Sequence, residues 1–298
     1  MSSPILNYIV YTIVLLCFLS SQEIPNDFYE LDLFDHKIDA GENWVINTTL
    51  GQKRYLNQEN YKEVLKLNPD SLYIVSRAGL EKLNKNNIVS FFSHFRYKIF
   101  LYGYLYSRIV NHPEQVPRYS GIPRNISRGG FNSGETDLSG IGFENKWLSL
   151  QIGRGREIWG SGKDIQISLS KTSPSYDYLM LGSNYGKIRV KYIYGFLEST
   201  SEKVNRYITA RGIEWSNKKN FLLSLSEIVI FSGLDRPIDL AYLNPISTHL
   251  EIELNNRLNI VGTDASNAIW QISFDWLPKD RLRISGNYLY DEFVLDEI

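Results

Sequence analysis

KIRVKYIYGFL, the stretch from Lys187 to Leu197, alternates polar and apolar side chains along most of its length. Lysine or arginine occupies the odd positions 187, 189 and 191. Every even position from Ile188 to Phe196 is aliphatic or aromatic. Successive side chains of a β-strand point to opposite faces of its sheet. The stretch therefore predicts a strand with one apolar face and one face that carries charge.

The same period of two recurs elsewhere between residues 91 and 298. Further alternating segments are Leu148–Ile152, Ile165–Leu169, Ile269–Leu277 and Arg281–Asp291. Short turn sequences separate neighbouring segments at 144–146, 184–186, 216–220 and 278–280, and a longer link runs from His112 to Asp137. Short connections make neighbouring strands antiparallel. We therefore expect an all-β, antiparallel up-and-down fold.

Three features indicate that the apolar face meets lipid and not a second sheet. The segments reach about ten residues, the length that a tilted membrane strand needs. Aromatic residues gather near segment ends, as at Trp270 and Trp276, where membrane barrels carry aromatic girdles. The opposite face carries Lys, Arg and Asp, which suits a wet or ion-paired interior. We expect residues 91–298 to form a transmembrane β-barrel in the lipid of a bacterial outer membrane.

The first 90 residues are expected to form two parts. Tyr8–Leu19 is an apolar run too short to cross a membrane as a helix. Small residues follow it, so we assign residues 1–22 to a secretory signal peptide; a buried strand or helix is the alternative. Residues 23–90 are expected to contain two short helices. The first would run from Asn57 to Leu67, and Asn68-Pro69-Asp70 would begin the second, which continues to Leu83.

Composition argues against several classes of function. The chain has 298 residues, with 32 Lys+Arg and 33 Asp+Glu, so no basic face for nucleic acid is expected. Cys17 is the only cysteine and the four histidines lie far apart, so we expect no disulfide, no metal site and no cofactor. No Ser/His/Asp or Cys/His set can be assembled, and we expect neither catalytic residues nor enzymatic activity.

GRGREIWGSG, from Gly153 to Gly162, is the most distinctive motif. A phosphate-binding loop would need a helix after it, whereas the following residues alternate as in a strand. Two interpretations stay open. The motif is a structural hairpin held by Arg–acid pairs, or it is a sugar-contact edge. In the second case Trp159 stacks on a sugar ring while Arg154 and Arg156 donate to hydroxyls or carboxylates.

Two acidic residues stand out near these segments. Asp177 follows Ser173-Pro174-Ser175-Tyr176, opens another predicted strand and is interpreted as a turn former. Glu227 has the same parity as Leu225, so strict alternation places a carboxylate on the apolar face. A bulge near Ser226 would turn Glu227 inward, where Arg211 is the expected partner.

Two further candidates lie nearer the end of the sequence. Asn244 belongs to Tyr242-Leu243-Asn244-Pro245, in which Asn–Pro predicts a turn. Asp291 precedes Glu292, but adjacent strand residues point to opposite faces, so the two do not form the paired carboxylates of a glycosidase.

Six stretches together carry a resemblance to a known family. They are GRGREIWGSG (153–162), SYDYLMLG (175–182), RYITARGIEW (206–215), LSLSEIVIFSG (223–233), AYLNPI (241–246) and YLYDEF (288–293). In this order and spacing the chain resembles the Wzi-type capsule-assembly proteins of the outer membrane, over about residues 90 to 296.

The resemblance implies a large antiparallel barrel with an N-terminal helical element. It also implies a lectin-like role in binding or anchoring capsule or extracellular polysaccharide at the cell surface, with other capsule export components as partners. The positions that match the family's recurrent residues would contact polysaccharide or brace the barrel: Arg154, Arg156, Trp159, Asp177, Glu227, Asn244 and Asp291.

The sequence departs from the family in its strand count. We find about ten to twelve alternating segments, fewer than the family's barrel needs, and no terminal aromatic residue. An open sheet edge is unfavourable in lipid. We therefore expect either a barrel truncated at its C-terminus or closure by a partner chain.

Three other functions stay open. One is a porin-like channel, lined by Lys187, Arg189, Lys191, Arg281 and Arg283. A second is an outer-membrane hydrolase that would use Ser226 or Glu227. The third is a soluble β-sandwich lectin.

Overall fold

A computed structural model of the chain contains one antiparallel β-sheet. The structure describes residues 49–50, 72–83, 85–98, 100–116, 119–145, 147–162, 166–170, 173–255, 257, 266–279 and 282–291.

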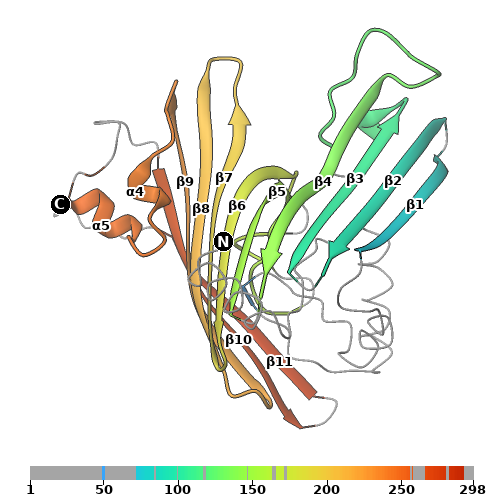
Figure 1. Ribbon diagram of the computed structural model, residues 1–298. Coiled ribbons are helices and arrows are strands. Elements are labelled where there is room, and N and C mark those ends of the chain that lie inside the picture. Colours follow the sequence, from blue (N-terminus) through green and yellow to red (C-terminus); the bar gives the residue numbers. More distant parts are fainter. Residues whose placement is uncertain are drawn as a thin grey trace, which may run out of the picture.

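The sheet has 11 strands, each hydrogen-bonded to the next along the chain (Figure 1). They are β1 (Leu72–Leu83), β2 (Asn86–Tyr97), β3 (Leu101–Val110), β4 (Ser133–Glu144), β5 (Leu148–Gly155), β6 (Tyr176–Tyr185), β7 (Ile188–Ser199), β8 (Val204–Ser216), β9 (Phe221–Leu234), β10 (Ser266–Lys279) and β11 (Leu282–Asp291). The predicted all-β, antiparallel up-and-down fold is confirmed. Among the described residues, β1 and β11 are the ends of the strand order, and no pairing between them closes the sheet.

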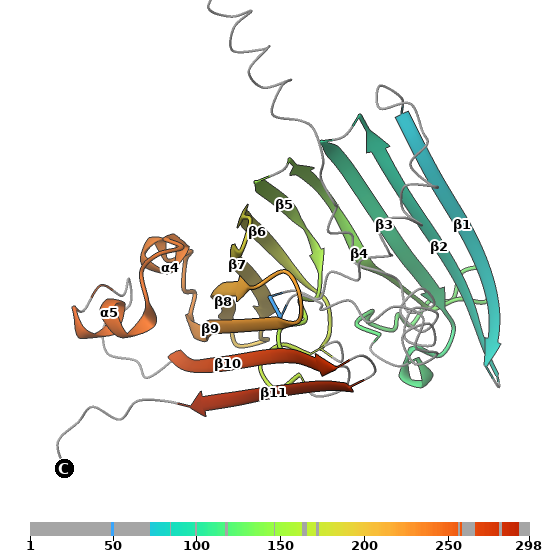
Figure 2. The ribbon, with the colours of Figure 1, turned by 90° about the horizontal axis from the view of Figure 1, so that it is seen from below.

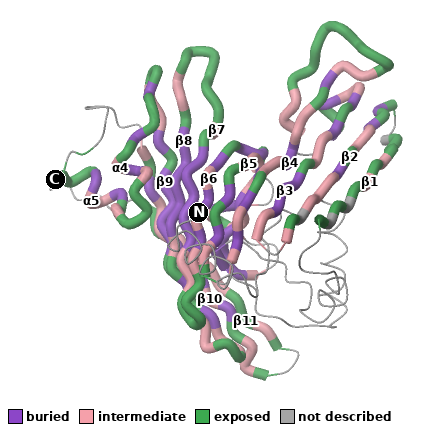
Figure 3. The backbone as a smooth tube through the Cα atoms, in the orientation of Figure 1, coloured by how far each residue is buried: buried purple, intermediate pink, exposed green. Residues whose placement is uncertain are grey.

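The sheet is curled, with a concave inner face and a convex outer face (Figure 2). Alternation assigns side chains to the two faces. On β7, Lys191 and Ile193 point inward, whereas Ile188 and Tyr192 point outward. Burial is deepest across the central strands and lowest along β1 (Figure 3).

Connections differ in length between the two ends of the sheet. At one end, the short-turn end, two to four residues join β2–β3, β4–β5, β6–β7, β8–β9 and β10–β11. At the other, the long-link end, three of the five connections are long: residues 111–132, 156–175 and 235–265. Consecutive connections of an up-and-down sheet lie at opposite ends, so the three long links, which alternate with short turns, all lie at one end.

The helices of the described residues are short and lie in two of the long links. A 3-10 turn, η1 (Pro113–Gln115), belongs to the first link, and α4 (Leu240–Leu243) and α5 (His249–Leu254) belong to the third. Asp239 and Thr248 cap α4 and α5 through side chains that accept from backbone amides. Both helices lie outside the curl (Figure 2). None of the described helices has the length and apolar character needed to cross a membrane.

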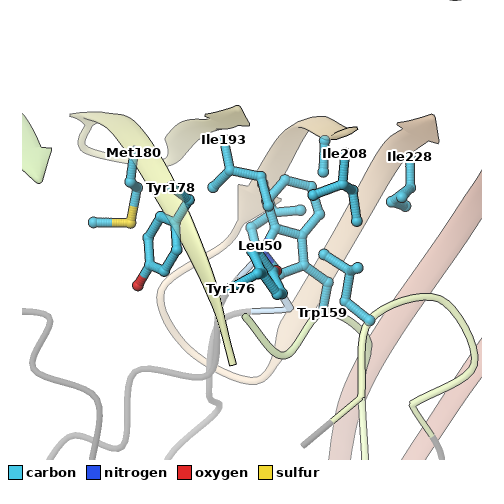
Figure 4. Close-up of a cluster of buried hydrophobic side chains, with 10 residues drawn as sticks. Leu50, Trp159, Tyr176, Tyr178, Met180, Ile193, Ile208 and Ile228 are labelled. Atoms are coloured by element: carbon cyan, nitrogen blue, oxygen red, sulfur yellow. The ribbon is translucent and has the colours of Figure 1, made fainter. Parts of the chain in front are cut away.

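Two apolar clusters lie on opposite faces of the central strands. The inner cluster (Figure 4) comprises Leu50, Trp159, Leu169, Tyr176, Tyr178, Met180, Ile193, Ile208, Ala210 and Ile228. The outer cluster comprises Tyr192, Tyr194, Tyr207, Val229, Phe231, Tyr242, Ile252 and Ala268. In each cluster a link between strands covers the sheet: residues 156–175 inside, and α4 with α5 outside.

The second predicted helix is wrong. Residues 72–83 form β1, whose register with β2 runs without a shift from Leu72↔Tyr97 to Leu83↔Asn86. Spacing of apolar residues in so short a segment is compatible with helix or strand, and the hydrogen-bond ladder with β2 decides between them. The sheet therefore begins at Leu72 and not at residue 91. The first predicted helix, Asn57–Leu67, and the signal peptide at 1–22 lie outside the described residues.

The strand predicted at Ile165–Leu169 is also wrong. Residues 166–170 contain only an isolated bridge, between Leu169 and Trp159. Leu169 is buried in the inner cluster, so its apolar side chain serves packing inside the curl and not a further strand of the sheet.

Candidate functional site

The distinctive GRGREIWGSG motif leaves the sheet at Gly155 and folds against the inner face. We call residues 156–175, which join β5 to β6, the inner loop. Trp159 is 0% exposed and packs among Ile193, Ile208 and Ile228 of the central strands (Figure 4). Leu50 and Leu169 each form a bridge with Trp159. The indole therefore offers no ring face to a sugar in this structure, and the geometry favours the bracing interpretation of this residue.

A buried ion pair lies directly beside Trp159. The carboxylate of Glu157 accepts from Lys191 Nζ at 2.7 Å and from the Trp159 indole Nε1 at 3.1 Å. Both charged side chains are nearly inaccessible to solvent. Lys191, expected to line a channel, is instead neutralised by the inner loop.

The inner loop also reaches the far edge of the sheet. Ser161 N donates to Asn287 Oδ1 at 2.8 Å, and Asn287 Nδ2 donates to Ser161 O at 2.8 Å. Asn287 belongs to β11. The loop thus connects β5 with β11 across the concave side.

Arg156 joins a second buried group of charges at the long-link end. Its guanidinium contacts both oxygens of Asp137, a side chain on β4. Arg108 on β3 pairs with Glu135 and approaches Asp137 at 3.9 Å. We call Arg108, Glu135, Asp137 and Arg156 the inner charge cluster. The cluster contains two cations and two acids, so its charges cancel. The pairing of Arg156 with an acid agrees with the interpretation of the motif as a structural hairpin held by Arg–acid pairs.

The inner charge cluster anchors the first long link. Glu135 Oε2 accepts from Ser120 N at 2.6 Å and from Ser120 Oγ at 2.9 Å. The Tyr119 hydroxyl donates to Ser133 Oγ at 3.2 Å, and Arg108 lies over the Tyr119 ring. Burial raises the pKa of Tyr119 further above neutral pH than that of a free phenol.

Arg154 and Asp177 form an exposed pair on the outer face. They are direct partners in the β5–β6 register, with Arg154 Nη1 3.2 Å from Asp177 Oδ2. Asp177 is the second residue of β6 and not the turn former that we expected. The pair lies next to the long-link end of the sheet.

Arg211 and Glu227 pair as predicted, but on the other face. They are partners in the β8–β9 register, with Arg211 Nε 3.2 Å from Glu227 Oε2. The predicted bulge near Ser226 is wrong, because β9 keeps its register with both neighbours through this position. Glu227 therefore stays on the outer face with Leu225. The backbone N–H of His249 donates to both Glu227 oxygens, at 3.0 and 3.2 Å.

The segment that covers this pair is held by stacked rings. Tyr242 stacks on Phe231 with centroids 4.3 Å apart, and its hydroxyl hydrogen-bonds His249 Nδ1 at 2.6 Å. Burial raises the pKa of Tyr242 well above its ordinary value, so the phenol remains neutral. Asn244 ends α4 in a turn, as its Asn–Pro sequence predicted, with its side chain bonded to Ile246 N and Ser247 Oγ.

Asp291 lies apart from the other candidates. It is the last residue of β11, opposite Ile269, and it is exposed. The eight candidates are thus distributed over three places: the inner face (Arg156, Trp159), the outer face (Arg154, Asp177, Arg211, Glu227, Asn244) and the sheet edge (Asp291).

Comparisons with protein-family models, curated proteins and solved structures give no match. In the described ranges no three His, Cys, Asp or Glu side chains gather in a way that could hold a metal ion.

Sequence reasoning missed several members of these groups. Arg108, Glu135, Asp137 and Glu157 are buried and charged, yet none of the four was singled out, although their contacts Arg156, Trp159 and Lys191 were. Alternation with Tyr104 and Tyr106 places Arg108 inward, but Glu135 faces inward only through the register shift between β3 and β4, which alternation does not predict. The cover by α4 and α5 was missed as well, although the Asp239 and Thr248 caps are visible in the sequence.

Proposed function

We propose that this chain is a bacterial outer-membrane β-barrel protein that binds or anchors capsule or extracellular polysaccharide at the cell surface. The location in a membrane is supported chiefly by the difference between the two faces of the sheet. Beyond the part that α4 and α5 cover, its outer face is largely apolar and exposed, with Arg154 and Asp177 as a charged pair near the long-link end. Its inner face carries buried charges such as Arg108, Glu157 and Lys191.

A continuous apolar row crosses four strands on the outer face. Ile213, Leu225, Ile272 and Tyr288 are successive cross-strand partners from β8 to β11, and each is 46–65% exposed. An apolar surface of this extent is unusual on a soluble protein. It is the arrangement expected of strands whose outward side chains meet lipid.

Aromatic side chains gather at the short-turn end. Tyr97, Trp147, Tyr185, Trp215 and Trp276 all lie there and are exposed. Such residues concentrate at the boundary between lipid and water. In outer-membrane barrels short turns face the periplasm and long links face the exterior, so we place the long-link end outside the cell.

The inner face favours a packed interior over the porin alternative. Lys191 pairs with Glu157, and Arg283 pairs with Asp275 at 2.5 Å. The inner loop crosses the concave side and fills part of it. Arg281, a further expected channel residue, lies outside the described residues.

The polysaccharide part of the proposal depends on the resemblance of the motifs to capsule-assembly barrels. Its structural support is the position of Arg154 and Asp177 near the long-link end, together with residues 119–132, which Glu135 anchors at Ser120. Insertion also requires that the edges at β1 and β11 be closed in the membrane, because unpaired backbone groups are costly in lipid.

The test uses the full chain in its own bacterium. We expect the protein in the outer-membrane fraction, extracted only by detergent, and we expect deletion of its gene to shift polysaccharide from the cell surface to the medium. Recovery in the soluble fraction would contradict the barrel. An unchanged ratio of attached to released polysaccharide would contradict the surface-glycan role. Steady ion conductance in planar bilayers would favour the porin alternative.

A further inference from the structure

The first long link forms a defined hairpin at its tip, residues 119–132. Arg128 N donates to Phe131 O at 2.8 Å, and Phe131 N donates to Arg128 O at 3.1 Å. Gly129 and Gly130, between them, have φ values of 60° and 86°. Two consecutive positive φ angles make a tight hairpin turn that glycine adopts without strain. The backbone of the tip is therefore fixed; we call this segment the arginine hairpin.

Hydrogen bonds also fix the base of the arginine hairpin. Arg124 N donates to Asn132 O at 2.9 Å, and Ser133 Oγ donates to Ile122 O at 3.1 Å. Ser120 is held by the carboxylate of Glu135 from the inner charge cluster. A loop held at several points presents its side chains with little ordering cost on binding.

The arginine hairpin exposes cationic and apolar side chains with no acidic residue between Tyr119 and Gly134. Arg124 and Arg128 are exposed, and neither forms a salt bridge within the part of the chain that the structure describes. Ile122 and Ile126 are 80% and 69% exposed. Fixed cations beside apolar side chains suit a ligand that carries acidic groups on a carbon framework.

The arginine hairpin extends past the ends of β3 and β4 (Figure 1). It therefore lies farther out than the strand ends, on the side that the proposed function places outside the cell. This position suits a polymer above the membrane surface better than a lipid headgroup at the level of the strand ends.

We propose that the arginine hairpin binds acidic sugar residues of a surface polysaccharide. Arg124 and Arg128 donate to carboxylate groups, for which the planar guanidinium offers paired N–H groups. Ile122 and Ile126 pack against the C–H faces of the sugar rings. The inference depends on the proposed function and adds the binding segment and the ligand's charge.

The test measures binding of the detergent-solubilised full chain to alginate, a polymer of uronic acids, with neutral dextran as the comparison polymer. We expect alginate binding that weakens as NaCl is raised. The Arg124→Gln/Arg128→Gln variant should bind alginate about tenfold more weakly, since two charge-assisted contacts are lost. The control variant Lys203→Gln/Arg206→Gln removes two exposed cations at the same end, one in the link between β7 and β8 and one near the start of β8, and should bind like the unaltered protein.

Three outcomes would overturn the inference: equal losses in the two variants, equally strong binding of dextran, or dependence on Arg124 and Arg128 only for vesicles that contain lipopolysaccharide. The last would identify lipid phosphate as the ligand. If the unaltered protein binds neither polymer nor the polysaccharide of its own bacterium, the proposed function fails too. If it binds alginate and the Arg124→Gln/Arg128→Gln variant matches it, only the hairpin assignment fails.

Discussion

Two buried ion pairs lie on opposite faces of the same sheet, and they are buried by different links. Lys191 and Glu157 meet on the inner face because the inner loop brings Glu157 back over β7. Arg211 and Glu227 lie side by side on the outer face, and the segment that contains α4 and α5 covers them. Strand position therefore decides which face a charge occupies, whereas the link above it decides whether that charge is tolerated there.

The largest expected effect comes from removing one partner of the outer pair. In Glu227→Ala the Arg211 guanidinium is left buried without an opposing charge, and we expect a loss of about 3–5 kcal/mol in the free energy of unfolding. Urea unfolding of the detergent-refolded full chain measures it. Arg211→Met/Glu227→Leu removes both charges and should lose far less; an equal loss in the two variants would show that the pair is not buried as a unit.

A slightly smaller effect is expected at Leu225, two residues earlier on the same face but beyond the cover. If Leu225 meets lipid, Leu225→Arg should cost about 2–4 kcal/mol near the bilayer midplane. If Leu225 meets water, a surface substitution of this kind changes stability by about 0.5 kcal/mol or less. Unfolding from lipid vesicles separates the two cases. Leu240→Arg, an exposed position in α4, is the control and should be near neutral.

Glu227 lies under the cover and Leu225 lies beyond it, and this difference shows how much the alternation of side chains can predict. Parity placed both residues on the apolar face, and the structure agrees. Arg211 was predicted as the partner of Glu227 on the inner face, and the two pair on the outer face instead. The bulge was invoked because a carboxylate on that face needed an explanation. The explanation is instead a cover formed by Tyr242 and Ile252, 15 and 25 positions after Glu227, which pack on Phe231 and Val229. Local periodicity does not contain such a contact.

The same limit explains the other errors. Residues 72–83 carry apolar side chains at spacings that fit a helix or a strand, and only the ladder with β2 selects the strand. Leu169 alternates like a strand residue but pairs with Trp159 inside the curl. The short turns predicted at 144–146, 184–186 and 216–220 overlap the observed connections, because such sequences encode local geometry: Gly186 has a φ of 74°, which glycine readily adopts. The turn predicted at 278–280 is wrong at Pro278 and Lys279, which belong to β10.

A moderate effect is expected where the inner loop reaches β11. Asn287→Ala removes two hydrogen bonds to the Ser161 backbone, and we expect a loss of about 1–3 kcal/mol, since buried polar groups lose their partners. Ser285→Ala, an exposed position on the same strand, should leave stability unchanged. Faster proteolysis of the inner loop in Asn287→Ala than in Ser285→Ala would show that this contact holds the loop in place; identical cleavage would contradict that role.

The smallest effect is expected for Arg154 and Asp177, the ion pair that no link covers within the described part of the chain. Their side chains are 21% and 62% exposed, so water and salt screen the attraction, and a double-mutant cycle of Arg154→Ala with Asp177→Ala should give a coupling of about 0–1 kcal/mol that falls as NaCl is raised. The two buried pairs should couple more strongly, with less dependence on salt. A strong, salt-insensitive coupling between Arg154 and Asp177 would break the comparison, since it would mean that lipid or another molecule covers this part of the outer face in the membrane. All three ion pairs join opposite charges, but only two are buried by a link. The cycle therefore tests whether this burial is the cause of the larger coupling free energy.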